Sequence, residues 1–398
     1  MKQEIAAVFG LLATIVTAKI HHLFVGNLAQ PSAIYALSFD TETFDLKVTK
    51  NITATGSHHW ITFSNQKTSL YGTSFFTPEI SSYSVLKNGT DLRLDKVLQT
   101  PKRCGDNDRS AHIVTLQREP QTVYIASWPG KPGCGTVFST LPNGTLSSVV
   151  QSFDYSSAAG IHGLALHPSD SYMYAADTTG DTLWTHVLSD NGTVSKTKRT
   201  NVSSIGKGPR HVTTHPNGLW LYALFEGSNT ISAFPIDPQT GSLGSPSHRY
   251  SLLPGSSYKS PINSTPPHDD KYWSAEITIS PSNKILWATA RAKGNTTDFG
   301  YISAFSLDSK GTIVDRLFIV PTTSTGGIAN SVSVAPDTDE FVAMTDLKNT
   351  GRDAGPWGNG YVQIWQVKGL DGSAPTAKAV AQADIKDGGC CANVIWYD

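Results

Sequence analysis

One strand pattern occurs six times along the chain, and this repeat restricts the fold more than any other feature. Each copy has a strand, a turn with Pro or Asn, and a second strand bearing Tyr, Trp or Phe. The copies are WITFSNQKTSLYGTSFF, HIVTLQREPQTVYIASW, GLALHPSDSYMYAAD, HVTTHPNGLWLYALFE, EITISPSNKILWATAR and SVSVAPDTDEFVAMTD. A third strand, a turn with glycine and a looser fourth strand follow each copy. Four-stranded units spaced about 50 residues apart predict the blades of a β-propeller.

A seventh copy is divided between the two ends of the sequence. HHLFVGNLAQPSAIYALSFD supplies a second and a third strand without a first, whereas ANVIWYD at the C-terminus is a first strand without a partner. Their pairing would complete a blade and remove the exposed edges of an open ring. We therefore predict an all-β fold, in which residues 19–398 form one seven-bladed β-propeller domain closed by pairing of the C-terminal strand with the N-terminal blade. A pair of β-sandwiches would leave the regular repeat unexplained.

Residues 1–18, MKQEIAAVFGLLATIVTA, have the organisation of a signal peptide. A lysine precedes an apolar run from Ile5 to Val16, and small residues lead to a cleavage site after Ala18. A first core strand is the alternative, but no repeat contains such a run. The N-x-S/T sequons that follow are at Asn51, Asn88, Asn143, Asn191, Asn201, Asn263 and Asn295. Leader and sequons together predict a secreted or cell-surface glycoprotein.

Composition excludes several classes of partner. Charged residues are 16% of the chain, against about 25% in a typical domain, which suits a sheet-rich protein. The formal charge is −1 and no Lys/Arg run is long enough to follow a phosphate backbone, so we expect no nucleic-acid partner. After the leader, no segment is apolar enough to span a bilayer. No feature of the sequence assigns an oligomeric state.

The cysteines predict a disulfide. With the divided blade counted as the first, Cys104 lies in the loop that enters the third blade and Cys134 follows that blade's second strand. Both loops open toward one face, so we predict a Cys104–Cys134 bond, which would close a loop of about 30 residues. Cys390 and Cys391 are adjacent. They could bridge each other, or either could pair with Cys104 or Cys134.

Charged and histidine side chains occur at the strand ends that a propeller brings together. The first strand of each blade is innermost, so its start and the end of the second strand lie on one face near the axis. The hairpins would therefore contribute side chains to one pocket. The residues at first-strand starts are His58, His59, His112, His162, Arg210, His211, Glu276 and Asn330. Those at or near second-strand ends are Trp128, Asp177, Glu226, Arg291 and Asp346.

Polar strand ends often only meet solvent, so any single histidine here is more often structural than catalytic. Arg210, Glu226 and Arg291 differ, because a charge near a propeller axis needs a partner or a ligand. A purely structural network of these charges is the alternative. The substrate-binding candidates around them are His59, His112, His211 and Glu276.

Absent motifs limit the chemistry. The chain has no G-x-S-x-G, no H-E-x-x-H, no Gly-rich phosphate loop and no Cys/His spacing typical of zinc. The segment PPHDDKYW carries His268, Asp269 and Asp270, but its place in a Pro/Ser-rich insertion favours a solvated loop or lid over a cation site. We expect no metal and no cofactor, which leaves acid/base or electrostatic catalysis.

Five short motifs follow one another along the chain. They are GIHG around His162, GPRH around Arg210, LYALFEG around Glu226, ATARAKG around Arg291 and the ending NVIWYD. In this order and at this spacing they resemble the carboxy-cis,cis-muconate cyclase branch of the seven-bladed lactonase family, from about His21 to Asp398. The resemblance implies a cofactor-independent cycloisomerase that converts 3-carboxy-cis,cis-muconate, or a related polycarboxylate diene, to its muconolactone. The catalytic residues that it implies are His162, Arg210, Glu226 and Arg291.

These residue types suit that reaction. One carboxylate adds to a double bond conjugated with another carboxylate, so negative charge grows on the acceptor before a proton reaches the adjacent carbon. Arginines bind carboxylates in bidentate fashion and stabilise such charge. His162, with an ordinary pKa of about 6.5, is the expected proton donor, and Glu226 is an orienting partner or alternate acid.

Two other functions stay open. A lactone hydrolase of the 6-phosphogluconolactonase type would need a positioned water and a base, for which Glu226 or Glu276 is available. A non-catalytic surface glycoprotein or antigen would keep the propeller for adhesion, although the presence of all four charged pocket positions argues against adhesion as the sole role. For an enzyme, the partner is a small polyanionic carboxylate or a lactone.

Overall fold

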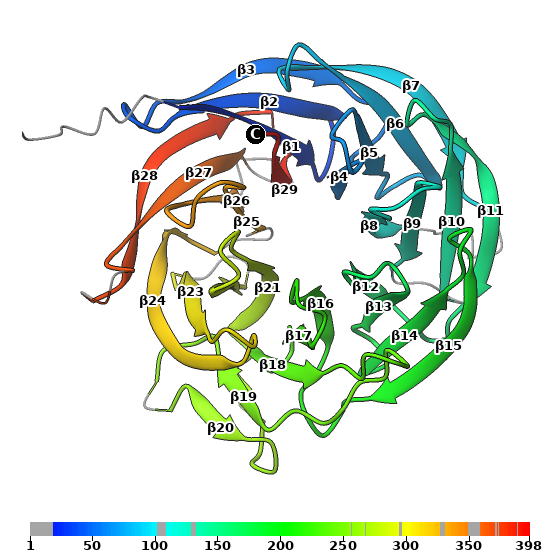
Figure 1. Ribbon diagram of the computed structural model, residues 1–398. Coiled ribbons are helices and arrows are strands. Elements are labelled where there is room, and N and C mark those ends of the chain that lie inside the picture. The colour runs from blue at the N-terminus through cyan, green and yellow to red at the C-terminus, as the bar shows by residue number, and fades with distance from the viewer. Residues whose placement is uncertain are drawn as a thin grey trace, which may run out of the picture.

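The computed structural model describes residues 19–101, 109–128, 133–255, 257–266, 268–293, 297–326, 331–348, 359–370, 372, 374–387 and 389–398. Over these residues the chain forms 29 strands in seven antiparallel sheets that stand side by side in a ring (Figure 1). The predicted seven-bladed β-propeller is confirmed. The described residues contain no helix of the length and apolar character needed to cross a membrane.

Strands run from the inner to the outer edge of each blade. The first blade has β29 (Cys390–Trp396), β1 (Ile20–Asn27), β2 (Ala33–Asp40) and β3 (Leu46–Thr53). The second has β4 (Ile61–Phe63), β5 (Ser69–Thr73), β6 (Glu79–Leu86) and β7 (Asp91–Gln99). The third has β8 (Ser110–Thr115), β9 (Thr122–Ser127), β10 (Cys134–Thr140) and β11 (Leu146–Asp154). The fourth has β12 (Ile161–Leu166), β13 (Tyr172–Asp177), β14 (Thr182–Leu188) and β15 (Val194–Asn201).

The remaining blades include one with an additional strand. The fifth has β16 (Pro209–Thr214), β17 (Trp220–Phe225), β18 (Thr230–Pro235), β19 (His248–Ser251) and β20 (Lys259–Pro261). The sixth has β21 (Tyr272–Ile279), β22 (Ile285–Ala292), β23 (Phe299–Leu307) and β24 (Ile313–Thr325). The seventh has β25 (Val332–Val334), β26 (Phe341–Lys348), β27 (Asn359–Lys368) and β28 (Thr376–Ile385). The strand β20 comes from the Pro/Ser-rich insertion, before the segment PPHDDKYW for which we expected a loop or lid.

The two ends of the chain complete the first blade, as predicted. The strand β29 pairs antiparallel with β1, with Leu23 opposite Trp396 and Val25 opposite Val394. At the outer end of this pair, the backbone N–H of His22 donates to a carboxylate oxygen of Asp398 at 2.7 Å. The pairing satisfies backbone groups that an open ring would leave exposed at both edges.

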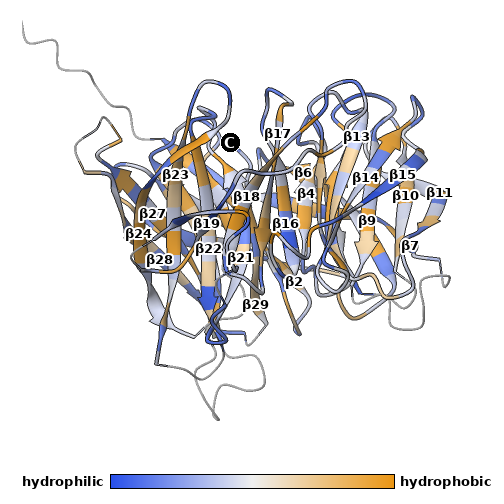
Figure 2. Ribbon diagram, turned by 90° about the horizontal axis from the view of Figure 1, so that it is seen from below, coloured by the Kyte–Doolittle hydropathy of each residue, from blue (hydrophilic) through white to orange (hydrophobic). Residues whose placement is uncertain are grey.

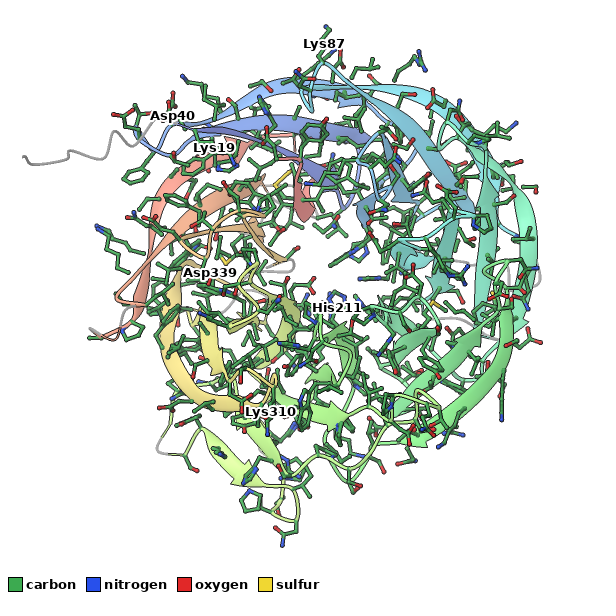
Figure 3. The ribbon with its side chains drawn as sticks, viewed as in Figure 1. Lys19, Asp40, Lys87, His211, Lys310 and Asp339 are labelled. Carbon is green, nitrogen blue, oxygen red and sulfur yellow. A yellow bond between two sulfur atoms is a disulfide. The ribbon has the colours of Figure 1, made fainter. Side chains whose placement is uncertain are left out.

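Apolar cores lie between neighbouring blades. Leu224 of the fifth blade, for example, belongs to the same buried cluster as Leu286 and Phe305 of the sixth. Figure 2 shows the apolar residues along the strands and hydrophilic residues in many of the loops at the two faces. Figure 3 places His211 toward the middle of the ring and Lys87 at its rim. The packing between blades is apolar, so the buried polar side chains near the axis need another explanation than blade packing.

A tyrosine on the second strand of several blades fastens the next blade. The hydroxyl of Tyr71 donates to the Gly144 carbonyl at 2.6 Å, and that of Tyr124 donates to the Gly192 carbonyl at 2.5 Å. Both glycines are in the turn between a third and a fourth strand, with φ of +83° and +80°. A Cβ on Gly144 would also lie 2.1 Å from Ser69 Oγ. This contact accounts for the aromatic residue and the glycine turn that recur in the sequence repeat.

The cysteines are resolved in part. Cys390 and Cys391 bond to each other, with a Cα–Cα distance of 3.0 Å, so the first of the open pairings is the one found. Cys134 is also disulfide-bonded. Its predicted partner, Cys104, lies outside the described residues, and the Cys104–Cys134 pairing stays a prediction.

The predicted leader, residues 1–18, and the sequon at Asn295 lie outside the described residues, and the other six sequon asparagines are exposed. Asn88, Asn143 and Asn191 lie in turns between third and fourth strands, on the face opposite the first-strand starts. We expect glycans on these three asparagines, which glycopeptide mapping of the protein would measure. Three unmodified asparagines beside a fully occupied Asn295 would contradict this expectation.

Candidate active site

A cavity of about 290 Å³ lies on the face where first strands begin and second strands end. It is lined by all four predicted catalytic residues, His162, Arg210, Glu226 and Arg291. Two of the substrate-binding candidates, His59 and Glu276, also line it. The convergence expected from the blade geometry is therefore present in the structure.

Bulges in the inner strands aim two of these side chains. The β12–β13 pairing shifts register between Ile161 and Gly163, and the β16–β17 pairing shifts between Pro209 and His211. His162 and Arg210 are the residues left out of the ladders, so their side chains can turn from the sheet toward the axis.

Gly163 lets the fourth and fifth blades approach each other at this point. A Cβ on Gly163 would lie 2.5 Å from the Arg210 carbonyl oxygen and 2.8 Å from the Cα of His211. The close approach brings His162 Nδ1 to 3.0 Å from His211 Nε2. The glycine in the GIHG motif thus determines the spacing between two residues of the site.

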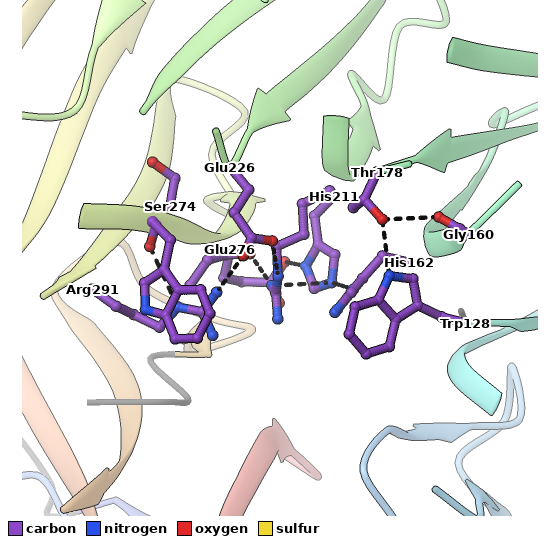
Figure 4. Close-up of polar contacts among 12 residues, drawn as sticks. Trp128, Gly160, His162, Thr178, His211, Glu226, Ser274, Glu276 and Arg291 are labelled. Carbon is purple, nitrogen blue, oxygen red and sulfur yellow. Dashed lines mark hydrogen bonds and ion pairs between the residues drawn. The ribbon is translucent and has the colours of Figure 1, made fainter. Parts of the chain in front are cut away.

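Glu226 forms ion pairs with both arginines, and Figure 4 shows it close to Arg291. Its Oε2 is 3.1 Å from Arg210 Nε, an ion pair without hydrogen-bond geometry, and its Oε1 accepts from Arg291 Nη2 at 3.4 Å. Arg210 Nη1 donates to the carbonyl of Ala275, and the Arg291 guanidinium lies 4.3 Å from the centre of the Trp273 ring. Both arginines are fixed by contacts on more than one side.

The arginines are buried cations. Arg210 is 6% exposed and Arg291 is 4% exposed. Burial lowers the pKa of Arg291 to about 9, with a further contribution from Arg210, and it also lowers the pKa of Arg210. Both groups are still charged near neutral pH. A cavity with two desolvated guanidinium groups in its wall favours a ligand with carboxylates.

The histidines are neutral. Burial lowers the pKa of His59 and of His112 to about 3. Burial, followed by the positive charge of Arg210, holds the pKa of His162 and of His211 well below 6.5. His162 therefore does not have the ordinary pKa of about 6.5 on which its predicted role as proton donor was based. In the folded protein its imidazolium is not the resting form, and a proton would have to leave the neutral ring.

Two substrate-binding candidates lie behind the cavity wall. The ring of His112 is 4.6 Å from that of Trp60, and the ring of His211 is 4.8 Å from it, so the indole covers both. Neither histidine lines the cavity. Substrate contact by His112 and His211 therefore stays a prediction, and the structure places the Trp60 ring against both of them.

Glu276 is buried in the wall. Its Oε1 lies 2.8 Å from His211 Nδ1 and accepts the backbone N–H of Ile277 at 3.0 Å. Its Oε2 is buried and has no hydrogen-bond partner among the described residues. Burial raises the pKa of this carboxyl group to about 8. Glu276 is therefore protonated at neutral pH.

Aromatic rings form much of the remaining wall. These are Trp60, Phe75, Trp128 and Trp273. Only Trp128 was among the residues predicted at the converging strand ends. Trp128 Nε1 donates to Thr178 Oγ1 at 2.8 Å, which fixes its ring beside His162 at 5.4 Å. In the sequence, Trp60 directly follows the candidate His59, and Trp273 lies three residues before Glu276. These positions were the signal that could have placed the two indoles in the site.

The closing strand β29 also contributes to the cavity. Cys391, Ala392 and Asn393 line it, and the Asn393 side chain bonds both the N–H and the carbonyl of Ile61 at 2.9 Å. The bond between Cys390 and Cys391 therefore lies at the cavity wall. Completion of the ring is part of the construction of the site.

Several strand-end residues do not reach the cavity. His58 bonds Tyr83 Oη at 2.6 Å, Asp177 accepts the N–H of Gly160 at 2.9 Å, and Asp346 accepts from Tyr361 at 3.2 Å. Asn330 lies outside the described residues. His268 and Asp270 form an exposed pair at 2.8 Å. Within the described ranges, no three His, Cys, Asp or Glu side chains form a group suited to a metal ion.

Comparison with known proteins agrees with the architecture. Residues 22–329 match the family described as lactonase, 7-bladed beta-propeller. The chain is 31% identical to a carboxy-cis,cis-muconate cyclase from Neurospora crassa, over 95% of this chain and 100% of the relative. It is 25% identical to muconate cycloisomerase 1 from Cutaneotrichosporon cutaneum, over 82% and 87% of the two chains.

A solved structure shows the same fold at lower identity. The periplasmic gluconolactonase of Pseudomonas aeruginosa superimposes with a TM-score of 0.74 at 15% identity, over 95% of this chain and 99% of the other. At that identity the likeness concerns the arrangement of the blades alone.

Proposed function

Because this chain belongs to the seven-bladed β-propeller lactonase family, we propose that its cavity catalyses a cofactor-independent cycloisomerisation of a polycarboxylate diene. The substrate that we propose is 3-carboxy-cis,cis-muconate or a close analogue, and the product is its muconolactone. The observation that carries the proposal is the pair of buried guanidinium groups of Arg210 and Arg291 in one cavity wall. The muconate-acting relatives support the choice of substrate class.

In the proposed reaction the two arginines stabilise negative charge and His162 supplies the proton. A carboxylate oxygen of the substrate forms a C–O bond to one carbon of a double bond. The π electrons move toward the conjugated carboxylate, which Arg210 and Arg291 would bind. Developing charge in a desolvated site is stabilised more strongly than in water, by about 3 kcal/mol per well-placed donor. A proton from His162 then adds to the adjacent carbon.

The wall favours ring closure over hydrolysis. A lactone hydrolase needs a base beside a positioned water. Glu276 is protonated near neutrality, and the Glu226 carboxylate is engaged by both arginines. The aromatic rings would pack against a planar diene and restrict water. Glu226 then has the role of holding the two guanidinium groups apart and in place.

Incubation of the purified protein with 3-carboxy-cis,cis-muconate and, separately, with simple lactones tests the function. We expect loss of diene absorbance with uptake of one proton per turnover, and no acid release from the lactones. Lactone hydrolysis without diene loss would replace the proposal with a hydrolase. Inactivity toward both substrates would favour a non-catalytic surface glycoprotein.

We also propose that the protein is secreted or displayed at the cell surface. The apolar leader and the exposure of six sequon asparagines support this location. The glycopeptide mapping described above tests it independently of activity.

A further inference from the structure

Glu276, His211 and His162 form a continuous series of contacts within the cavity wall (Figure 4). Glu276 Oε1 is 2.8 Å from His211 Nδ1, and His211 Nε2 is 3.0 Å from His162 Nδ1. His211 is 1% exposed and the other two are 7% and 5% exposed. His162 lines the cavity, and its Nε2 is the nitrogen that remains for a bound molecule.

The surroundings of the two carboxyl oxygens of Glu276 determine which of them carries the proton. Among the described residues Oε2 has no hydrogen-bond partner, so an ionised carboxylate would leave this buried oxygen without a hydrogen bond. A proton on Oε2 would equally have no acceptor among those residues. A proton on Oε1 has His211 Nδ1 as an acceptor at 2.8 Å, while the Ile277 N–H still contacts the same oxygen.

This position fixes both histidine tautomers. If His211 Nδ1 accepts from Glu276, its Nε2 carries a hydrogen and donates to His162 Nδ1. His162 Nε2 then carries a hydrogen that faces the cavity. Arg210 Nη1 is 3.4 Å from His211 Nε2, longer than the 3.0 Å to His162, so His162 is the nearer partner of that nitrogen.

We propose that Glu276, His211 and His162 form a proton relay, in which Glu276 resupplies through His211 the proton that His162 gives to the substrate carbon. The inference rests on the proposed function. In one turnover the bond from hydrogen to His162 Nε2 breaks and a C–H bond forms. The hydrogen on His211 Nε2 moves to His162 Nδ1, and the Glu276 proton moves to His211 Nδ1. Both rings end neutral with hydrogen on Nδ1, and Glu276 ends as a carboxylate. After the product leaves, a proton from solvent adds to His162 Nε2. In the same step the hydrogen on His162 Nδ1 returns to His211 Nε2 and the one on His211 Nδ1 returns to Glu276, which restores the starting tautomers and the carboxyl group.

The relay resolves a conflict in the site. The proposed reaction needs an acid, yet both histidines resist protonation because they are buried beside Arg210. Transfer along neutral rings never forms an imidazolium. The negative charge arises on Glu276, where Arg210 and Arg291 stabilise the carboxylate form. Glu276 and His211 are positioning residues in this scheme, since they act through His162.

The charged groups around Glu276 determine the pH range over which its carboxyl group is protonated. Arg210 and His211 face it from β16, Arg291 from β22, and Glu226 follows β17; β25 adds no titratable side chain. The carboxyl pKa is raised to about 8, so the proton is present below that pH and is lost above it. Loss of charge on Arg291, whose pKa is about 9, would follow at higher pH.

Glu276→Gln tests the relay by kinetics. The amide is close in size and shape to the carboxyl group, but it cannot release a proton. We expect kcat to fall by about 10²-fold or more, with KM nearly unchanged. In the wild-type protein kcat/KM should decline near pH 8 as Glu276 ionises. The residual activity of Glu276→Gln should lack this decline and should fall only near pH 9, where Arg291 loses its charge. An unchanged kcat or pH profile would overturn the relay.

A matched pair of histidine variants separates the relay from simple stability. His186 is fully buried and bonds Tyr155 Oη at 3.1 Å, in the outer part of the fourth blade. We expect His211→Gln and His186→Gln both to lower the thermal midpoint, and only His211→Gln to lower turnover per folded molecule. Equal turnover in the two variants would contradict the proposal.

Imidazole nitrogen NMR tests the relay without any substrate. Below pH 8 we expect His162 and His211 both to carry hydrogen on Nε2, and both to switch to Nδ1 as Glu276 ionises. Tautomers with hydrogen on Nδ1 at neutral pH, or no coupled switch, would refute the relay. Coupled switching in a protein inactive toward the diene would retain the relay and reject the proposed substrate.

Discussion

Replacing Arg291 with methionine is expected to lower kcat/KM for the polycarboxylate diene by about 10²-fold or more, and Arg210→Met should do the same. Methionine keeps much of the side-chain volume but removes the donors. A charge-assisted pair lost from a desolvated site costs about 3 kcal/mol, which corresponds to this factor. Steady-state kinetics on the purified variants measures it.

Stability should change much less than activity in these variants. Each guanidinium loses hydration on burial, and its ion pair with Glu226 returns only part of that cost. Arg249→Met is the matched control, because Arg249 is fully buried but donates to the carbonyls of Ile205, Ile262 and Ser264 in the outer fifth blade. It should lose stability and keep turnover per folded molecule. The same pattern in Arg210→Met and Arg291→Met would show a structural network without chemistry.

His162→Ala is expected to lower kcat by about 10²- to 10⁴-fold, because the proton reaches carbon only in the transition state. KM should change little, since the arginines hold the substrate. His167→Ala is a suitable control: His167 comes directly after the last residue of β12, and its Nε2 is 3.0 Å from the Gly218 carbonyl. A higher KM with unchanged kcat in His162→Ala would assign this residue to binding.

The ring and its closure were predictable from the sequence because the repeat records a local pattern of strands and turns. Once the blades are in order, geometry alone brings Arg210, Glu226 and Arg291 to one face. The additional strand β20 was not predictable, since its three residues, Lys259–Pro261, carry no strand pattern of their own.

The finer structure of the site depends on effects that the alternation of apolar and polar residues along a strand does not encode. The bulges at His162 and Arg210 break the two-residue period that would otherwise tell which way a side chain points. Trp60 covers His112 and His211 through contacts between blades. The raised pKa of Glu276 arises from burial among residues of three strands, and no short motif specifies such surroundings.

The contact from a tyrosine to the glycine turn of the next blade has a consequence for how such a protein can evolve. These contacts, such as Tyr71 with Gly144, lie between neighbouring blades and away from the inner strand ends that carry the site. Substitutions at those inner ends can therefore alter ligand and chemistry while the attachment of each blade to its neighbour persists. The contacts from tyrosine to glycine turn are thus made by other residues than those that line the cavity.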